Sequence, residues 1–171
     1  MTGEAPQSGD ELPVLGVRVA TSEDTASVLG RLELAIGLVE DARGGAILAA
    51  RARRHELAEV VRSAIASERS TVLLGTLDDQ VWGQTLVSLE ELDEGVLARV
   101  DQLWVDPEAR NIGLGRTMML AAVTWARSAD CVGIDAAALP GDRSTKNFFE
   151  SFGLVARELI VHTGLGDHAD I

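Results

Sequence analysis

Apolar and polar positions in the first part of the chain predict one strand and two helices. Val14–Ala20 is apolar and β-branched, which favours a strand. A capping sequence, Thr-Ser-Glu-Asp, follows, and we expect a helix over Thr21–Glu40. Gly44-Gly45 interrupts the pattern, and a second helix is expected between Ala49 and Ser67, with its charged residues on the wetter side.

The middle of the chain changes to a two-residue period. Apolar and polar residues alternate in three segments separated by short polar turns. The turns at residues 78–79 and 90–95 are rich in acidic residues and are short enough for hairpins. The pattern therefore predicts three strands, over Ser70–Leu77, Gln80–Leu89 and Val96–Val105.

Helical spacing returns after Pro107. Leu114, Met118, Ala121 and Trp125 fall on one face of a helix, and we interpret this stripe as core. The second half predicts a helix over Gly113–Arg127, a strand over Val132–Ala138, a short helix from Asp142 or Ser144 through Phe152 that ends at Gly153, and a last strand over Val155–Thr163.

The order of these elements is β-α-α-β-β-β-α-β-α-β, which predicts an α/β fold with helices on both faces of a mixed sheet. Residues 1–13 are polar and carry two glycines and two prolines, so we expect a tail there. Since 171 residues is the size of one ordinary domain, residues 14–171 are expected to form a single domain.

Composition narrows the classes of function. The formal charge of −12 argues against a nucleic-acid platform, which needs a basic surface. The single cysteine, Cys131, excludes an intrachain disulfide and a cysteine-rich metal site, and no metal is expected. No apolar run is long enough to cross a membrane, and the polar start is unlike a signal peptide, so we expect a cytoplasmic protein.

A glycine-rich turn carries the most specific chemistry. It runs from Val105 to Arg116 and places Gly113 and Gly115 at the start of a predicted helix. Backbone amides at a helix start lack intrahelical partners, and the helix dipole favours an anion there, so a phosphate or pyrophosphate is the expected ligand. The P-loop would require a lysine where Arg116 stands, and the dinucleotide fingerprint would require a third glycine where Met118 stands.

Two spaced motifs make this region resemble the GNAT superfamily of N-acetyltransferases. Arg110, Gly113 and Gly115 match the Arg/Gln-x-x-Gly-x-Gly/Ala core of the acyl-CoA signature. The segment Asn147–Leu154 resembles the second motif, an aromatic pair followed by glutamate and a helix-ending glycine. The start of the chain, Val17–Asp24, looks like the first strand and helix of the family.

The resemblance implies a largely antiparallel sheet of six to seven strands with about four helices on both faces. The fourth and fifth strands would splay apart to receive the pantetheine of acetyl-CoA, the acyl donor. The residues implied to contact the donor are Leu103, Trp104, Val105, Arg110, Asn111, Ile112, Gly113, Leu114, Gly115, Arg116, Asp142 and Phe149.

The chain departs from the family at Phe149. The family commonly has tyrosine there, often proposed to protonate the leaving thiolate, and this chain contains no tyrosine. A phenol can donate that proton and a phenyl ring cannot. Three alternatives remain: protonation by water or by Ser144 or Ser151, unassisted departure of the thiolate, or a domain that binds acyl-CoA without efficient turnover.

An amine attacks only after losing its proton, so the reaction also needs a base. Asp101, Glu90 and Glu91 lie on strands expected to face the site. Strand alternation places Asp101 on the same face as Leu103 and Val105, which makes it the preferred candidate for a catalytic residue, ahead of Glu90.

These features predict transfer of an acetyl group from acetyl-CoA to a primary amine of a small molecule or peptide, by direct attack in a ternary complex. Alternatives are a non-catalytic acyl-CoA-binding sensor and, less favoured, a nucleotide-binding protein. Because Val155–Thr163 would leave an open sheet edge, we also expect a homodimer that covers it.

Overall fold

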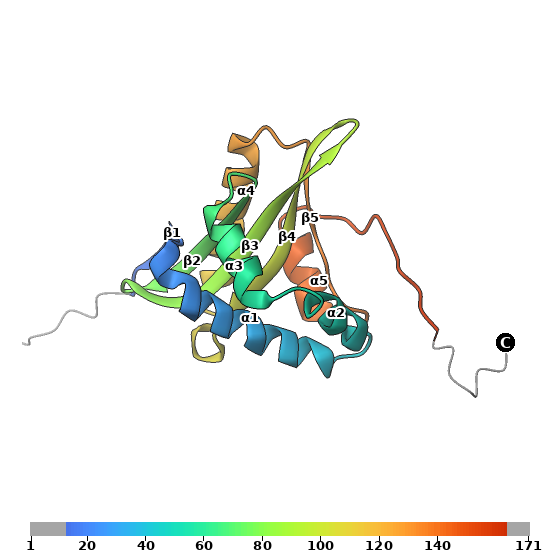
Figure 1. Cartoon of the computed structure of the whole chain (residues 1–171), viewed down its shortest axis with the longest axis horizontal. Coiled ribbons are helices and arrows are strands. Elements are labelled where there is room, and N and C mark those ends of the chain that lie inside the picture. Colours follow the sequence, from blue (N-terminus) through green and yellow to red (C-terminus); the bar gives the residue numbers. More distant parts are fainter. Residues whose placement is uncertain (1–12, 164–171) are drawn as a thin grey trace, which may run out of the picture.

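The computed structural model describes residues 13–163. One five-stranded sheet forms in the order β1-β2-β3-β4-β5 (Figure 1). The first four strands are antiparallel, and β5 runs parallel to β4. The strands are β1 (Leu15–Val19), β2 (Ser70–Leu77), β3 (Gln80–Leu92), β4 (Gly95–Val105) and β5 (Gly133–Ala136).

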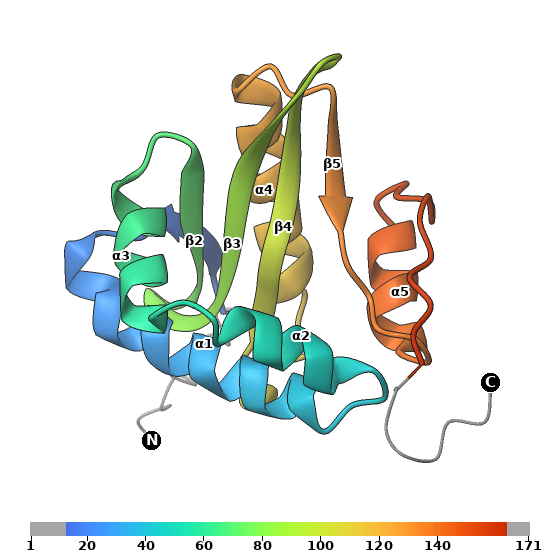
Figure 2. The same cartoon turned by 45° about the vertical axis from the view of Figure 1, so that its right-hand side comes forward.

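Helices cover both faces of the sheet (Figures 1 and 2). They are α1 (Thr25–Glu40), α2 (Gly45–Ala52), α3 (Leu57–Ala66), α4 (Leu114–Ser128) and α5 (Arg143–Glu150), with short 3-10 turns at Ser22–Asp24 and Pro107–Ala109. This is the predicted α/β architecture with a mixed, largely antiparallel sheet.

Two apolar layers hold the helices in place. On one face Val28 of α1 and Val61 of α3 pack against Val72 and Leu74 of β2. On the other face α4 packs its buried side along the sheet, with Met118 and Met119 fully buried. The apolar stripe of α4 that the spacing predicts to be core therefore packs in the core. A functional site is then expected at the ends of the elements.

The central hairpin forms where the polar turn predicts it. Asp78 and Asp79 both have positive φ, at 48° and 66°. Two consecutive residues of this kind form the turn that matches the twist of a two-stranded hairpin, and aspartate tolerates this conformation better than most residues. The turn fixes the register of β2 against β3.

Two sequence predictions are wrong in detail. The helix expected between Ala49 and Ser67 is two helices, α2 and α3, separated by the exposed segment Arg53–Glu56. Four consecutive polar residues provide no apolar contact that would hold one continuous helix against the sheet.

The last predicted strand, Val155–Thr163, is also wrong: the segment has no regular structure. Its apolar residues favour a strand, but a strand forms only where a neighbour supplies hydrogen bonds, and none of the described strands pairs with it. The sheet therefore has five strands rather than six or seven.

The predicted tail lies, apart from Pro13, outside the described residues. Within residues 13–163, no helix is long and apolar enough to cross a membrane.

Candidate functional site

The sheet forks between β4 and β5. The two strands pair only from Leu97–Gly133 to Val100–Ala136. Beyond Val100, β4 continues for five residues beside β3, whereas the chain after Ala136 turns away toward α5 (Figure 2). The end of β4 thus keeps one neighbour and leaves its other edge facing the fork.

A β-bulge marks the point where the fork opens. Leu86 of β3 pairs with Gln102 and Val87 pairs with Val100, so Asp101 is the extra residue. A bulge bends a strand and changes which way the following residues point. Bulges of this kind often lie beside functional sites because they redirect a side chain.

The bulge also redirects the backbone of β4. The carbonyl of Val96 accepts a hydrogen bond from the Val132 amide, so the backbone N–H and C=O groups of even-numbered residues before the bulge point toward β5. The Asp106 amide donates to β3, at the Trp82 carbonyl. After the bulge, the backbone N–H and C=O groups of odd-numbered residues therefore point into the fork.

Leu103 and Val105 are the residues whose amides face the fork. In agreement with this direction, the carbonyl of Val105 accepts a hydrogen bond of 3.1 Å from Nε of Arg110, which lies outside β3. An unpaired strand edge of this kind can form hydrogen bonds with an extended, amide-containing ligand.

The bulge overturns one prediction from strand alternation. Asp101 does not share a face with Leu103: its carboxylate accepts a hydrogen bond of 2.6 Å from Ser88, on the α1 and α3 face. Leu103 packs instead with Leu114 and Met118 of α4. The extra residue places Asp101 and Gln102 on the same side.

The environment of Asp101 makes its carboxylate a stronger base than an ordinary aspartate. Desolvation raises the pKa of its carboxyl above the ordinary value, opposed by the Ser88 hydrogen bond and by Arg99, whose Nε lies 3.4 Å from Oδ1. The side chain is still 42% exposed, so a substrate can reach it. A carboxylate with a raised pKa accepts a proton more readily than an ordinary aspartate.

The start of α4 forms the second part of the site. Asn111 and Gly113 have positive φ, at 64° and 98°, and Gly113 is the residue before the first turn of the helix. Among residues 13–163, the backbone amides from Asn111 to Arg116 have no backbone acceptor. Together with the helix dipole, these donors form an anion site.

Three elements meet at Gly115. A Cβ at this position would lie 3.5 Å from Cγ2 of Val105, 3.6 Å from Cε2 of Phe148 and 3.8 Å from Cδ2 of Leu103. The end of β4, the start of α4 and α5 therefore converge there. The guanidinium of Arg116 lies 5.2 Å from the centre of the Phe152 ring.

The side chain of Arg110 contacts nearby residues of the turn. Its guanidinium lies 5.1 Å from the centre of the Trp104 ring, in addition to its bond with Val105. Trp104 in turn donates from Nε1 to Asp106, at 2.7 Å. Arg110 and Trp104 therefore brace the turn, and the backbone of the turn remains for a ligand.

Phe149 lies at the base of the fork. It is 9% exposed and packs with Val100, the last residue of β4 that pairs with β5, and with Met119 of α4. Phe148 and Phe152 pack around this cluster. The Phe149 ring thus packs among apolar side chains of β4, α4 and the aromatic cluster around α5.

The remaining predicted residues lie at the margins. Asp142 caps α5: its carboxylate accepts from the Thr145 amide at 3.0 Å and from the Ser144 hydroxyl at 2.8 Å, and these bonds lower its pKa. Glu90 is exposed on β3 opposite Leu97, in the paired part of the sheet.

Two polar residues behind the fork are not among the site residues predicted from the sequence. Gln84 is fully buried and donates from Nε2 to the Val28 carbonyl of α1, at 3.1 Å, and to Oε1 of Gln102, at 2.7 Å. Gln102 follows the bulge directly. The pair ties the bulge to α1, and a glutamine at an inward strand position was the signal for it.

A partly buried ion pair ties α1 to the end of β4 as well. Arg31 donates to Asp106 from Nε at 3.1 Å and from Nη2 at 3.0 Å, and Nη2 also donates to the Val81 carbonyl at 2.8 Å.

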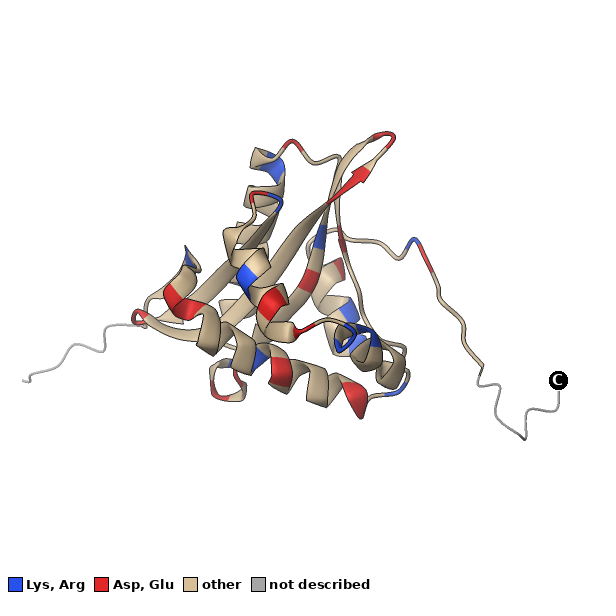
Figure 3. Ribbon diagram, in the orientation of Figure 1, with Lys and Arg blue, Asp and Glu red and all other residues tan. Residues whose placement is uncertain are grey.

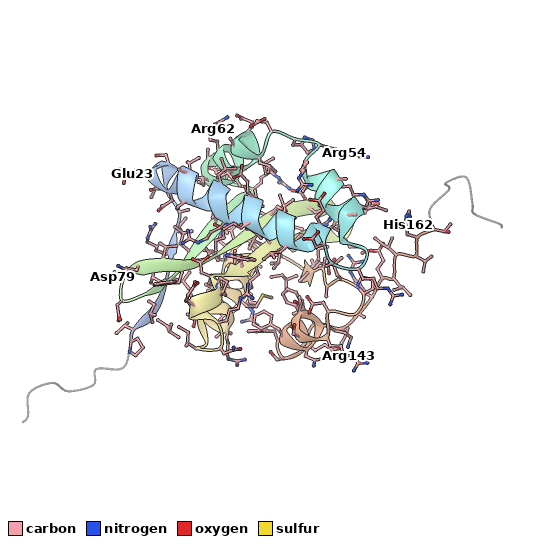
Figure 4. All side chains as sticks on the ribbon, turned by 90° about the horizontal axis from the view of Figure 1, so that it is seen from below. Glu23, Arg54, Arg62, Asp79, Arg143 and His162 are labelled. Carbon is pink, nitrogen blue, oxygen red and sulfur yellow. The ribbon has the colours of Figure 1, made fainter. Side chains whose placement is uncertain are left out.

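Figure 4, seen from below, shows α1 and α2 with the labelled Arg54 on one side, and α5 with the labelled Arg143 on the other.

Several of the solved structures similar to this one are acetyltransferases. AAC(6')-Iy, in complex with the bisubstrate analogue CoA-S-monomethyl-acetylneamine, aligns with a TM-score of 0.68 at 11% identity over 88% of this chain and 97% of that chain. An aminoglycoside acetyltransferase from an uncultured soil metagenomic sample, in complex with sisomicin, aligns at 0.66 and 16% identity, over 88% and 94%.

A Trypanosoma brucei acetyltransferase aligns at 0.62 and 20% identity, over 89% of this chain and 100% of that chain. The fold is therefore that of an acetyltransferase. The model of the Acetyltransferase (GNAT) family matches residues 46–154, which is more than half of the chain. The chain belongs to the GNAT acetyltransferase family. No curated protein matches it.

Proposed function

We propose that the protein transfers an acetyl group from acetyl-CoA to a primary amine. The observation that carries the proposal is the fork: a strand edge with free amides ends at a helix start with further free amides. Membership of the family supports acyl transfer from CoA in general. The acetyl group, the amine and the residues below are our assignment.

We propose that acetyl-CoA binds along the fork, at the end of β4 and at the start of α4. The amides from Asn111 to Arg116 would hold the pyrophosphate, and Leu103 and Val105 would bind the amide groups of pantetheine. Gly115 leaves room where the three elements converge. The donor supplies a thioester whose carbonyl would accept a hydrogen bond from a β4 amide, which stabilises negative charge on oxygen.

Asp101 is the proposed general base. It takes the proton of the acceptor ammonium, directly or through one water, and the amine nitrogen then attacks the thioester carbon. The nitrogen of the resulting tetrahedral intermediate gives its second proton to solvent, the carbon–sulfur bond breaks, and the electron pair leaves with sulfur, so that a neutral amide forms. The raised pKa of Asp101 makes it a better proton acceptor, and Ser88 and Arg99 hold its carboxylate in place.

No phenol protonates the sulfur in this chain. Phe149 fills that position, and the Ser144 hydroxyl is engaged with Asp142. We therefore propose that the sulfur leaves as a thiolate and takes its proton from solvent, because thiols have pKa values of about 8–9.

Phe149 also supports a second candidate function, binding of acyl-CoA without turnover. The apolar surroundings of Phe149 would hold an acyl group and give no proton to sulfur. Release of free CoA separates the two candidates.

The acceptor we propose is a cationic amine of a small molecule or peptide. Asp101, Glu90 and Asp135 lie on the α1 and α3 side of β3, β4 and β5, and the chain as a whole carries a charge of −12. Figure 3 shows acidic residues along these strands and at the tip of the β3–β4 hairpin. Charge of this sign attracts ammonium groups.

The test is an amine panel with acetyl-CoA, read as steady release of free CoA. The panel spans aminoglycosides, polyamines and peptides, and acetate is a non-amine control. Turnover with any amine supports the enzyme. Thermal stabilisation by acetyl-CoA with no turnover supports the binding domain, and stabilisation by ATP but by neither CoA species refutes both.

A further inference from the structure

Asp106, the residue directly after β4, is held from several sides. Its Oδ2 accepts from Nε and Nη2 of Arg31 in α1, at 3.1 and 3.0 Å, and its Oδ1 accepts from Nε1 of Trp104, at 2.7 Å. Its amide donates to the Trp82 carbonyl of β3, at 2.8 Å, and its carbonyl accepts from the Ala109 amide, at 2.9 Å. Both carboxylate oxygens and both backbone groups of Asp106 are therefore engaged.

Asp106 is also the first residue of the turn that leads to the proposed pyrophosphate site. Its bond with the Ala109 amide closes the short 3-10 turn Pro107–Ala109. That turn leads through Arg110 to the segment Asn111–Arg116, whose amides are proposed to bind the donor. The placement of Asp106 therefore sets the point from which these amides are positioned.

Arg31 connects Asp106 to α1. Its Nη2 donates also to the Val81 carbonyl of β3, at 2.8 Å, so the guanidinium bridges β3 and the end of β4. The side chains of Arg31 and Asp106 are only 16% and 20% exposed, and a pair shielded in this way is screened less by salt than an exposed pair. The planar fork of donors on a guanidinium also holds its partners in one orientation.

The contacts continue from Asp106 to the far end of the turn. Trp104, which donates to Asp106, places the centre of its ring 5.1 Å from the Arg110 guanidinium. Arg110 in turn donates to the Val105 carbonyl, at 3.1 Å. Both ends of the turn are thus joined through side chains to α1, which lies on the opposite face of the sheet from α4.

The ion pair also balances a charge that would oppose the donor. A pyrophosphate is an anion, and a carboxylate without a partner at the start of its binding turn would repel it. The guanidinium of Arg31 compensates the charge of Asp106. Loss of Arg31 would therefore weaken donor binding in two ways, through the geometry of the turn and through its charge.

We propose that Arg31 is a positioning residue for the donor. It acts through Asp106 and holds the start of the turn in the conformation whose amides bind the pyrophosphate. This inference rests on the proposed function, since the donor is the acetyl-CoA proposed above, and it gives α1 a part in donor binding. Arg31 acts without contacting the reacting atoms.

The first test is the affinity of Arg31 variants for acetyl-CoA, measured by isothermal titration. Arg31→Met keeps an unbranched side chain and removes its charge and donors, and it should raise the dissociation constant by about tenfold or more. Arg31→Lys keeps the charge but lacks the fork of donors, so its affinity should lie between those of Arg31→Met and wild type. An unaltered affinity in Arg31→Met overturns the inference.

Arg18→Met is the matched control, because it removes another arginine–aspartate pair of the same helix. Arg18 donates to both carboxylate oxygens of Asp24 at the start of α1, at 2.8 and 2.7 Å, and β2 and β3 separate its strand from β4. Thermal unfolding should show a loss of stability in both variants, whereas acetyl-CoA affinity should fall only in Arg31→Met. An equal fall of affinity in both variants would make the role of Arg31 merely structural and overturn the inference.

Asp106→Asn tests whether Arg31 acts through Asp106. The amide has one acceptor oxygen for two partners, Arg31 and Trp104, so this variant should also bind acetyl-CoA more weakly than wild type. Combined with Arg31→Met, it should weaken binding by no more than about twofold beyond the weaker single variant, because both changes remove the same contact. Effects that multiply in the double variant overturn the route through Asp106.

Hydrogen exchange without the donor distinguishes failure of this inference from failure of the proposed function. The amides of Asp106 and Ala109 are both hydrogen-bonded, and Arg31→Met should speed their exchange while Arg18→Met should not. Unchanged exchange in Arg31→Met overturns the inference. A wild type that fails to bind acetyl-CoA refutes the proposed function, and the exchange rates then still decide whether Arg31 holds the turn.

Discussion

The two halves of β4 have the same neighbour on one side and different ones on the other. From Leu97 to Val100 the strand lies between β3 and β5, and Ala98 and Val100 are buried. From Asp101 to Val105 it pairs with β3 alone. One strand therefore serves two purposes, with a single extra residue between them.

The difference shows how a sheet can hold a site without losing stability. In the paired half, backbone groups are satisfied within the chain and side chains fill the core. In the forked half, the same kinds of groups remain for a ligand, and α1 braces the strand through Arg31 and Gln84. Changes in the forked half should therefore affect function more than stability.

The largest effect is expected for Asp101→Asn, at the boundary of the two halves. Loss of the base should lower kcat/KM by about 100- to 10,000-fold. The pH profile should lose its acid limb, because the proposed base would act only when its carboxyl is ionised. Steady-state rates against pH measure both effects.

Although Asp101→Asn should lower activity, it should not lower the free energy of unfolding. Burial raises the folded-state pKa of Asp101 above 3.8, so ionisation disfavours the folded state as pH rises through that range. Removing the charge should leave the free energy of unfolding at neutral pH unchanged or higher. Glu94→Gln at the hairpin tip is the control, and equal losses of activity in both variants would rule out Asp101 as the base.

Gly113→Ala tests the start of α4, beyond the forked half. A residue with a Cβ at φ 98° is strained by an amount on the order of 1–3 kcal/mol, so the amide turn should shift. Acetyl-CoA affinity should fall by about tenfold. Isothermal titration measures it.

Gly30→Ala is the matched control, because a Cβ there meets nothing within 4 Å in the interior of α1. This change should leave acetyl-CoA affinity unaltered and stabilise the fold by about 0.5–1 kcal/mol. An unaltered affinity in Gly113→Ala would mean that the turn does not hold the donor.

Phe149→Tyr probes the base of the fork. A phenol at this position gives sulfur a proton donor, and turnover should rise by about two- to tenfold below pH 10, where the phenol is protonated. Phe152→Tyr adds the same hydroxyl elsewhere in the aromatic cluster and should give no increase. Turnover that is absent in wild type and appears in Phe149→Tyr would favour the binding domain as the natural function.

The smallest effect is expected at Asp142, which caps the helix beside the fork. Asp142→Ala should cost about 1 kcal/mol, and Asp142→Asn should retain the cap. The folded-state pKa of Asp142 is lowered, so its contribution is present above the ordinary value of 3.8 and is lost as pH falls through the lower folded value.

Thermal unfolding against pH checks this sign. Wild type should lose stability relative to Asp142→Asn only in the acid range. A constant difference between the two proteins from neutral to acid pH would contradict the cap.

Much of the fold could be predicted from the sequence. β2 has the predicted bounds, and α4 and β5 differ from their predicted bounds by no more than two residues at either end. The positions of Gly113 and Asp142 also agree, because a helix start depends on local backbone conformation and capping. The acyl-CoA signature and the aromatic motif identified the family.

The bulge could not be predicted. Strand alternation assigned Asp101 to the face of Leu103, and one extra residue reversed that assignment. The residues around Asp101 are compatible with a regular strand, and the bulge exists only in the register of β4 against β3. The contacts of Gln84 with Val28 and of Arg31 with Val81 likewise join residues that are 56 and 50 positions apart in the sequence.

The sequence alone determined the periodicities, the caps, the glycine-rich turn and the absence of tyrosine, because each depends on residues within a few positions of one another or on a count. Only the tertiary structure decided where β4 leaves β5, which face carries Asp101 and that Val155–Thr163 pairs with no strand within residues 13–163. Each of these depends on pairing between distant segments, which local propensity does not specify.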